Sequence, residues 1–247
     1  MQTKSFRIDR YISKKLNINR RDIKLMLARG RIVINGEVIR EITTIVEEFD
    51  HVVLDGQLLQ DKQAVYIMMN KPIGVVSATK DELHTTVIDL LPDDLLSDAL
   101  NNEGLHIVGR LDLNTSGLLL LTNDSRWSRK LMSPDAKVAK VYQVTLENDL
   151  TEETVTAFAE GMYFPFEDVT TLPARLTILS EKVAEVVLME GKYHQIKRMF
   201  GRFRNPVLAL HRSSVGNLLL DADLDAGKSR ALTSGEVSSI FDVAAVI

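Results

Sequence analysis

The segment Gly104–Asp124 restricts the possible folds of this chain more than any other stretch. An apolar run over residues 105–109 leads into Arg110-Leu111-Asp112, and a polar turn at 114–117 precedes four consecutive leucines. Short apolar runs bounded by turn residues are typical of strands buried in a core. The segment therefore predicts two core strands joined by a loop, with the carboxylate of Asp112 at the mouth of that loop.

Two interpretations of Asp112 follow from its position in the loop. A carboxylate held between two core strands is well placed for catalysis, because its surroundings are rigid. A turn aspartate that accepts hydrogen bonds from nearby backbone amides gives the same local pattern. Spacing alone favours the turn aspartate, so a catalytic role needs support from other parts of the chain.

Beyond residue 64, strand candidates cluster instead of alternating regularly with helices. Thr151 is a suitable N-cap for one helix, and Thr233 with Glu236 forms a capping box for a helix near the C-terminus. Clustered strands with few helices indicate an α+β fold with a mixed, mostly antiparallel sheet. The strand candidates are residues 65–69, 105–109, 117–122, 140–146, 172–180 and 183–190.

The first sixty residues follow a different pattern. Apolar residues recur at helical spacing over Ile8–Leu16, and Asn19 is a good N-cap for a second helix that ends near Gly30. Apolar residues then alternate around Asn35-Gly36, a strong signal for a tight hairpin turn. We expect a small domain of two helices followed by a hairpin.

This change of pattern predicts two domains, over residues 1–60 and 64–247, with a short linker near 57–63. No apolar run is long enough to span a bilayer, and the N-terminus has no signal-peptide pattern, so we expect a cytoplasmic protein. The absence of cysteine excludes disulfides and thiolate metal sites, and the five histidines lack ligand-like spacing. No long exposed apolar stripe is evident, which favours a monomer.

The net charge of −4 argues against a nucleic-acid partner until its distribution is considered. The first 31 residues contain ten Lys and Arg against two Asp. Such segregation is typical of a phosphate-binding surface on an acidic protein, although two solvated helix faces would give the same pattern. A second basic cluster, with no acid between residues 191 and 220, comprises Lys192, Lys197, Arg198, Arg202, Arg204 and Arg212.

The N-terminal quarter resembles the S4 RNA-binding module. The resemblance depends on residues 7–11, Ser13, residues 28–36 with their Arg-Gly-Arg corner, and residues 50–53. It implies docking on structured RNA through shape and phosphate contacts. The candidate RNA contacts of this module are Arg7, Arg10, Arg20, Arg21, Lys24, Arg29 and Arg31.

Five ordered motifs of the larger domain resemble those of the RsuA-like pseudouridine synthases. The most specific motif is Gly109-Arg110-Leu111-Asp112, which is followed by Thr115–Thr122. The other four motifs are Asn70–Gly74, Lys140-Val141-Tyr142, Glu190–Met199 and Leu210-His211-Arg212. With the S4-like module in front, the resemblance covers nearly the whole chain. It implies a cofactor-free, metal-free isomerase that cleaves the glycosidic bond of a uridine, turns the uracil and rejoins it through carbon 5.

The resemblance also assigns roles to individual residues. Asp112 matches the nucleophile, and Tyr142 matches the tyrosine that stacks on the uracil. Arg110 matches the arginine that fills the space left by the flipped nucleotide. A cation near Asp112 would keep it ionised, and Lys197 matches that position, where relatives more often have arginine.

Arg198 is the alternative partner of Asp112, and otherwise a candidate phosphate contact. Further candidates for phosphate or base contacts are Lys71, His194 and Gln195.

The sequence Tyr193-His194-Gln195, where most branches of the family have Asn-Arg-Gln, resembles the branch that modifies small-subunit (16S) ribosomal RNA. The expected partner is therefore that RNA or the assembling small subunit. A sister enzyme acting on large-subunit (23S) RNA and a non-catalytic RNA-binding assembly factor are alternatives. A glycoside hydrolase is a third, because Asp112 and Asp124 could form a carboxylate pair.

Overall fold

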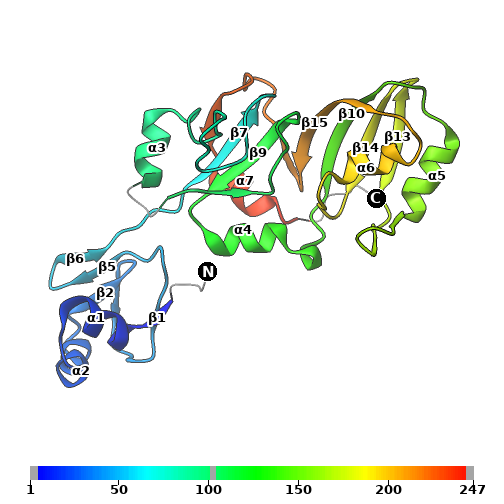
Figure 1. Ribbon diagram of the computed structural model, residues 1–247. Coiled ribbons are helices and arrows are strands. Elements are labelled where there is room, and N and C mark those ends of the chain that lie inside the picture. The colour runs from blue at the N-terminus through cyan, green and yellow to red at the C-terminus, as the bar shows by residue number, and fades with distance from the viewer. Residues whose placement is uncertain (1–4, 101–103, 243–247) are drawn as a thin grey trace. The chain divides into compact units, whose positions relative to one another are not determined.

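The computed structural model describes residues 5–100 and 104–242 (Figure 1). Contacts divide the chain between Ala64 and Val65 into two compact units, which we call the small unit and the large unit. Among the described residues, no helix is long and apolar enough to cross a membrane.

The small unit combines two helices with short antiparallel strands. Its elements are β1 (Phe6–Arg7), α1 (Ile8–Leu16), α2 (Arg20–Ala28), β2 (Ile32–Ile34), β3 (Glu37–Ile39), β4 (Ile45–Val46), β5 (Val52–Leu54) and β6 (Gln57–Gln60). The strands form a sheet of order β3-β2-β5-β6 and a separate pair of β1 with β4. Ile8, Ile12 and Ile23 pack with strand residues such as Ile32 and Val52 in one core.

Local signals predicted much of this unit. The Asn19 side chain accepts a hydrogen bond from the Asp22 amide, as an N-cap does, so that prediction is confirmed. Asn35 and Gly36 have φ values of 50° and 84°, as a type I′ turn requires, and the hairpin is confirmed. The predicted linker near 57–63 is wrong for residues 57–60, because these form β6 and pair with β5.

The large unit has helices on both sides of one long sheet. Its helices are α3 (Asp93–Leu100), α4 (Ser125–Met132), the 3₁₀ turn η1 (Pro134–Ala136), α5 (Glu152–Glu160), α6 (Gln195–Gly201) and α7 (Ser234–Ser239). Its strands are β7 (Tyr66–Lys71), β8 (His106–Val108), β9 (Ser116–Thr122), β10 (Lys140–Leu146), β11 (Tyr163–Phe164), β12 (Val169–Thr170), β13 (Arg175–Ser180), β14 (Val183–Leu188), β15 (Val207–Val215), β16 (Leu218–Leu219) and β17 (Ser229–Ala231). Thr151 and the Thr233–Glu236 capping box begin α5 and α7 as predicted.

Nine of these strands form one sheet of order β13-β14-β10-β15-β9-β7-β17, with β16 beside β15 and β8 beside β9. Within the described residues, only β15 and β9 pair in parallel. The expected α+β class with a mixed, mostly antiparallel sheet is therefore confirmed.

The four leucines of β9 explain why apolar side chains must pack on both faces of this sheet. Leu118 and Leu120 pack with Trp127 of α4, while Leu119 and Leu121 join the core that contains Phe158 of α5. Successive side chains of a strand point to opposite faces, so a continuous apolar strand requires two apolar layers. Figure 1 shows β9 in the middle of this sheet with α4 close by.

Strand β15 was missed in the sequence, although it lies at the centre of the sheet between β10 and β9. Its sequence begins with the apolar run Val207–Leu210 but continues with His211, Arg212 and two serines, so only its first half has the pattern of a buried strand. The basic pattern suggested an exposed segment. The structure instead buries Arg212 to 2% exposure inside the sheet.

Candidate active site

The loop that carries Asp112 connects β8 to β9, which pair antiparallel from His106↔Thr122 to Val108↔Leu120. The Thr115 amide donates a hydrogen bond to the Asp112 carbonyl at 3.0 Å, and this closes the turn. The predicted loop between two core strands is therefore present. Asp112 lies in it with 33% of its side chain exposed.

Lys71, at the end of β7, ties this loop to the sheet from inside. Its side chain is fully buried, and Nζ donates to the carbonyls of Pro72, Asp112 and Thr115 at 3.0, 3.0 and 2.8 Å. Burial lowers the pKa of Lys71 to about 8; the Asp112 charge opposes this shift and the Lys197 charge adds to it. The prediction that Lys71 contacts RNA is wrong, because its ammonium group is enclosed by the protein.

Arg212 holds the other side of the same loop. Its Nε donates to the Leu118 carbonyl at 2.8 Å, and Nη2 donates to the Gly109 carbonyl at 2.9 Å. The strand that carries it comes so close to Gly117 that a Cβ at residue 117 would lie 2.3 Å from the Arg212 backbone oxygen. Only glycine fits there, and its φ of +104° also requires glycine.

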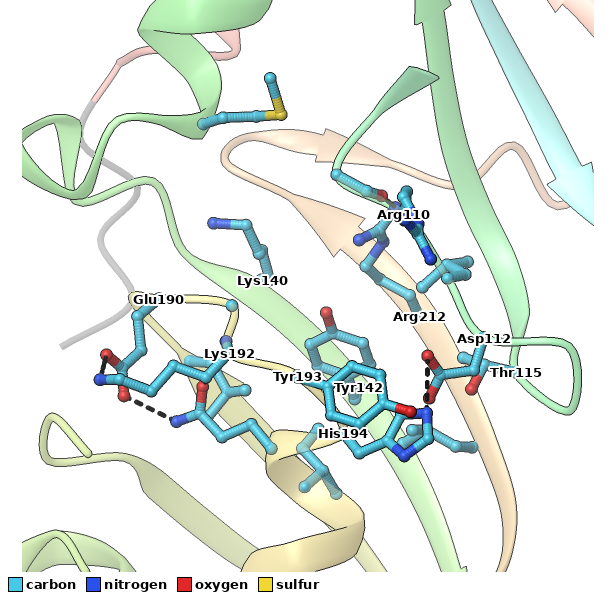
Figure 2. A pocket seen from close by; sticks show the side chains of 18 of the residues that line it. Arg110, Asp112, Thr115, Lys140, Tyr142, Glu190, Lys192, Tyr193, His194 and Arg212 are labelled. Atoms are coloured by element: carbon cyan, nitrogen blue, oxygen red, sulfur yellow. Dashed lines mark hydrogen bonds and ion pairs between the residues drawn. The ribbon is translucent and has the colours of Figure 1, made fainter. Parts of the chain in front are cut away.

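Two nitrogen groups flank the carboxylate of Asp112. His194 Nε2 lies 3.3 Å from Oδ1, and Lys197 Nζ lies 3.5 Å from Oδ2. Arg198, the alternative partner, instead pairs with Glu167 at 2.6 Å and lies over the Phe164 ring. The structure thus places Lys197 beside Asp112 and directs Arg198 elsewhere. Figure 2 shows the His194 imidazole directed at the carboxylate.

The segment before α6 sets the position of His194. His194 is the N-cap residue with a left-handed φ of 48°, and its carbonyl accepts from the Arg198 amide at 2.9 Å. The Tyr193 ring stacks on the imidazole with a centroid separation of 3.9 Å and an interplanar angle of 19°. Tyr193 itself is 73% exposed, so its outer face is open to a ligand.

Gln195, predicted to contact phosphate or base, lies buried in the protein. It is 5% exposed, its Oε1 accepts from the Lys192 amide, and its Nε2 donates to Glu190 at 2.8 Å. Lys192 forms an ion pair with the same glutamate. With both ends of its amide bonded to the protein, Gln195 orders the segment before α6 and is not positioned as a phosphate contact.

A cavity of about 790 Å³ opens beside Asp112. Tyr142 of β10 forms part of its wall while only 8% exposed, so the ring serves both the core and the cavity. Arg110 is exposed at the same cavity, as a residue that replaces a flipped base would be. Figure 2 shows these side chains around the opening, with Tyr193 and His194 on one side.

Lys140 and Arg212 also line this cavity, and neither was among the predicted site residues. Burial lowers the pKa of Lys140 to about 8, and the nearby charge of Arg212 adds to this effect. A signal for Lys140 was available, because residues two apart on a strand share a face and Lys140 is two residues before Tyr142. Arg212 lies opposite Tyr142 in the β10–β15 register. Its position could not be predicted because strand β15 was not predicted.

The second basic cluster does not form one surface. Lys192, Lys197 and Arg198 each pair with an acid, Arg202 donates to the Tyr163 carbonyl, and Arg212 is buried. The phosphate-binding interpretation of this cluster, which the sequence left open beside solvated helix faces, gains no support from these five side chains. Most of these cationic side chains instead bond to groups of the protein in and around the cavity.

The basic residues of the small unit fall into two groups. Arg7 forms two hydrogen bonds with buried Asp9, Arg20 lies 3.7 Å from the same carboxylate, and Arg31 pairs with Asp55. The remaining candidates are exposed: Arg10, Arg21, Lys24 and Arg29. This second group is the better placed for phosphate contacts.

Asp124 does not form a carboxylate pair with Asp112. Its Oδ1 caps α4 by accepting from the Arg126 and Trp127 amides, and its Oδ2 accepts from the Tyr66 hydroxyl at 2.8 Å. It lies beyond the far end of β9, whereas Asp112 precedes that strand. The hydrolase alternative therefore loses its second carboxylate.

The site combines a carboxylate, a cation beside it and an aromatic side chain in the wall of one cavity, which are groups that covalent chemistry on a flat ring requires. Residues 65–201 match the family model described as RNA pseudouridylate synthase. The chain belongs to the RNA pseudouridylate synthase family.

Among its relatives, the ribosomal small subunit pseudouridine synthase A of Pseudomonas aeruginosa is 46% identical over 95% of this chain and 100% of its own length. The protein of the same name from Escherichia coli K12 is 36% identical over 95% of this chain and 99% of its own length. A crystal structure of a pseudouridylate synthase superimposes with a TM-score of 0.67 at 33% identity, covering 95% of this chain and 99% of that chain. The chain thus resembles an rRNA isomerase along nearly its whole length.

Proposed function

We propose that this protein converts one uridine of small-subunit (16S) ribosomal RNA to pseudouridine. The observation that carries the proposal is the Asp112 carboxylate, held between His194 and Lys197 at the edge of the cavity. Two full-length relatives with the name ribosomal small subunit pseudouridine synthase A support the choice of RNA.

In this proposal the target nucleotide leaves the RNA stack and enters the cavity. A stacked base hides its glycosidic bond, and flipping costs a few kcal/mol. The exposed Arg110 occupies the vacated space, and the Tyr142 ring supports the uracil. Stacking on a ring lets the detached base turn without leaving, because a π-face has no preferred in-plane orientation.

Asp112 then acts at the ribose while the glycosidic bond breaks, and Lys197 lies 3.5 Å from its carboxylate as the neighbouring cation. The buried walls around Tyr142 exclude water that would otherwise capture the reactive sugar. The uracil rejoins the sugar through carbon 5, the carbon-5 proton passes to a base or to solvent, and nitrogen 1 takes up a proton, so that the product is an isomer of the substrate. No cofactor or metal takes part in this sequence of steps.

The small unit would hold structured RNA as an S4-like module, through the exposed residues Arg10, Arg21, Lys24 and Arg29. We also expect the protein to act as a monomer in the cytoplasm, where ribosomal RNA is made and assembled.

The test is a pseudouridine-specific chemical-stop assay on unmodified 16S and 23S transcripts and on small-subunit particles. We expect one new stop in 16S RNA. The variant Asp112→Asn should reduce the rate at least about 10³-fold, because it removes the nucleophile. It should still bind RNA, since the phosphate contacts remain.

Stops in 23S RNA alone would replace the proposed substrate with that of a sister enzyme. Activity that survives in Asp112→Asn would contradict the mechanism. RNA binding without any new stop would favour the assembly factor.

A further inference from the structure

The two oxygens of Asp112 have separate partners on one short stretch of chain. His194 Nε2 lies 3.3 Å from Oδ1 and Lys197 Nζ lies 3.5 Å from Oδ2. A lysine ammonium is a point charge on a flexible stem, and it cannot fix the plane of a carboxylate. Two nitrogen groups beside different oxygens can hold that plane, as the two arms of a bidentate arginine do.

We propose that His194 is a positioning residue, and that it forms with Lys197 a divided clamp that does the work of a single bidentate arginine. The imidazole Nε2 of His194 completes this clamp at Oδ1. The inference deepens the proposed function, because Asp112 is there the reacting carboxylate.

The clamp belongs to a rigid element, as a positioning device requires. His194 caps α6, and Lys197 lies one turn further along, so both nitrogens move with the same helix. The stacked Tyr193 ring fixes the plane of the imidazole, and the left-handed φ of His194 sets the direction of its side chain. Asp112 comes from the β8–β9 loop, which Lys71 and Arg212 hold from inside.

Within the described residues, the Asp112 carboxylate has ion pairs only with His194 and Lys197. Lys71 also faces this loop, but its Nζ donates to the Asp112 carbonyl and not to the carboxylate.

In the part of the chain that the structure describes, the other charged side chains that line the cavity form no ion pair with Asp112. They are Arg110, Lys140, Arg212 and the Lys192–Glu190 ion pair.

The first test removes one half of the clamp. His194→Phe keeps a ring against Tyr193 but has no ring nitrogen, and we expect kcat to fall about 30-fold, the effect of losing one close polar contact to the reacting carboxylate. KM for 16S RNA should stay within about 3-fold, because the phosphate contacts remain. The matched control is His84→Phe, since His84 pairs with Asp81 at 3.1 Å on an exposed loop and should have no effect.

The second test restores the clamp by another route. Lys197→Arg in the His194→Phe background supplies both donors from one guanidinium, and it should recover at least about 10-fold of the lost kcat. A purely structural role for His194 predicts no such rescue.

Each result decides between defined alternatives. Wild-type kcat in His194→Phe, or no rescue by Lys197→Arg in a protein that melts like the wild type, would overturn the clamp and leave the proposed function intact. A wild type that forms no pseudouridine in either ribosomal RNA would overturn the proposed function and the clamp with it.

Discussion

The two units use the same basic amino acids in opposite ways. In the small unit, Arg21 and Lys24 of α2 project into solvent, whereas in the large unit Lys71 and Arg212 are almost completely buried. A buried cation is stable only when its donors are satisfied, and here backbone carbonyls of the Asp112 loop accept them. The comparison teaches that basic residues in an RNA-modifying enzyme can serve the protein's own backbone as well as phosphate.

The strongest test of this difference concerns Arg212. Replacement by Met fills the space of the stem but leaves the Leu118 and Gly109 carbonyls without their donors. The loss of two charge-assisted hydrogen bonds should cost about 3–5 kcal/mol in the free energy of unfolding, measured in urea. The matched variant Arg21→Met should change it by less than about 0.5 kcal/mol, as surface substitutions do. Equal losses would remove the distinction between the two units.

The burial of Lys71 can be tested through the pH dependence of the free energy of unfolding. Burial lowers its pKa to about 8, against about 10.4 in an unfolded chain. Between these values the unfolded chain holds a proton that the folded one lacks. Its contribution to stability is therefore complete above about pH 10.4 and is lost as pH falls through about 8.

The measurement compares wild type with Lys71→Met in urea at pH 7.5 and 9.5. The stability of the wild type relative to the variant should rise by about 1–2 kcal/mol over that interval. A constant difference, or one that falls with pH, would mean that Lys71 keeps its proton throughout.

The smallest expected effect comes from two arginines on either side of Gly30. Arg29 is exposed, while Arg31 pairs with Asp55. Replacing Arg29 with Ala should reduce the slope of log K against log[salt] for RNA binding by about 0.7–0.9, and replacing Arg31 should reduce it by less than half of that. Equal slopes for both variants would show that the Asp55 ion pair opens when RNA binds.

Much of the fold could be predicted from local patterns in the sequence. The apolar runs of Gly104–Asp124 determined two core strands and the loop between them, because a continuous apolar strand can only lie inside a sheet. Caps and turn residues such as Asn19, Thr151 and Asn35-Gly36 determined where local elements begin and reverse. Ordered motifs identified Asp112 as the candidate nucleophile before any geometry was known.

Only the tertiary structure decided which basic residues are buried and which of them lie beside the Asp112 carboxylate. Lys71, His194, Lys197 and Arg212 reach one loop from distant parts of the chain, and no local pattern encodes such contacts. The burial of a cation depends on acceptors that come together only after folding. For the same reason the sequence indicated Asp112 and one cation beside it, while the second donor, His194, followed from where α6 packs.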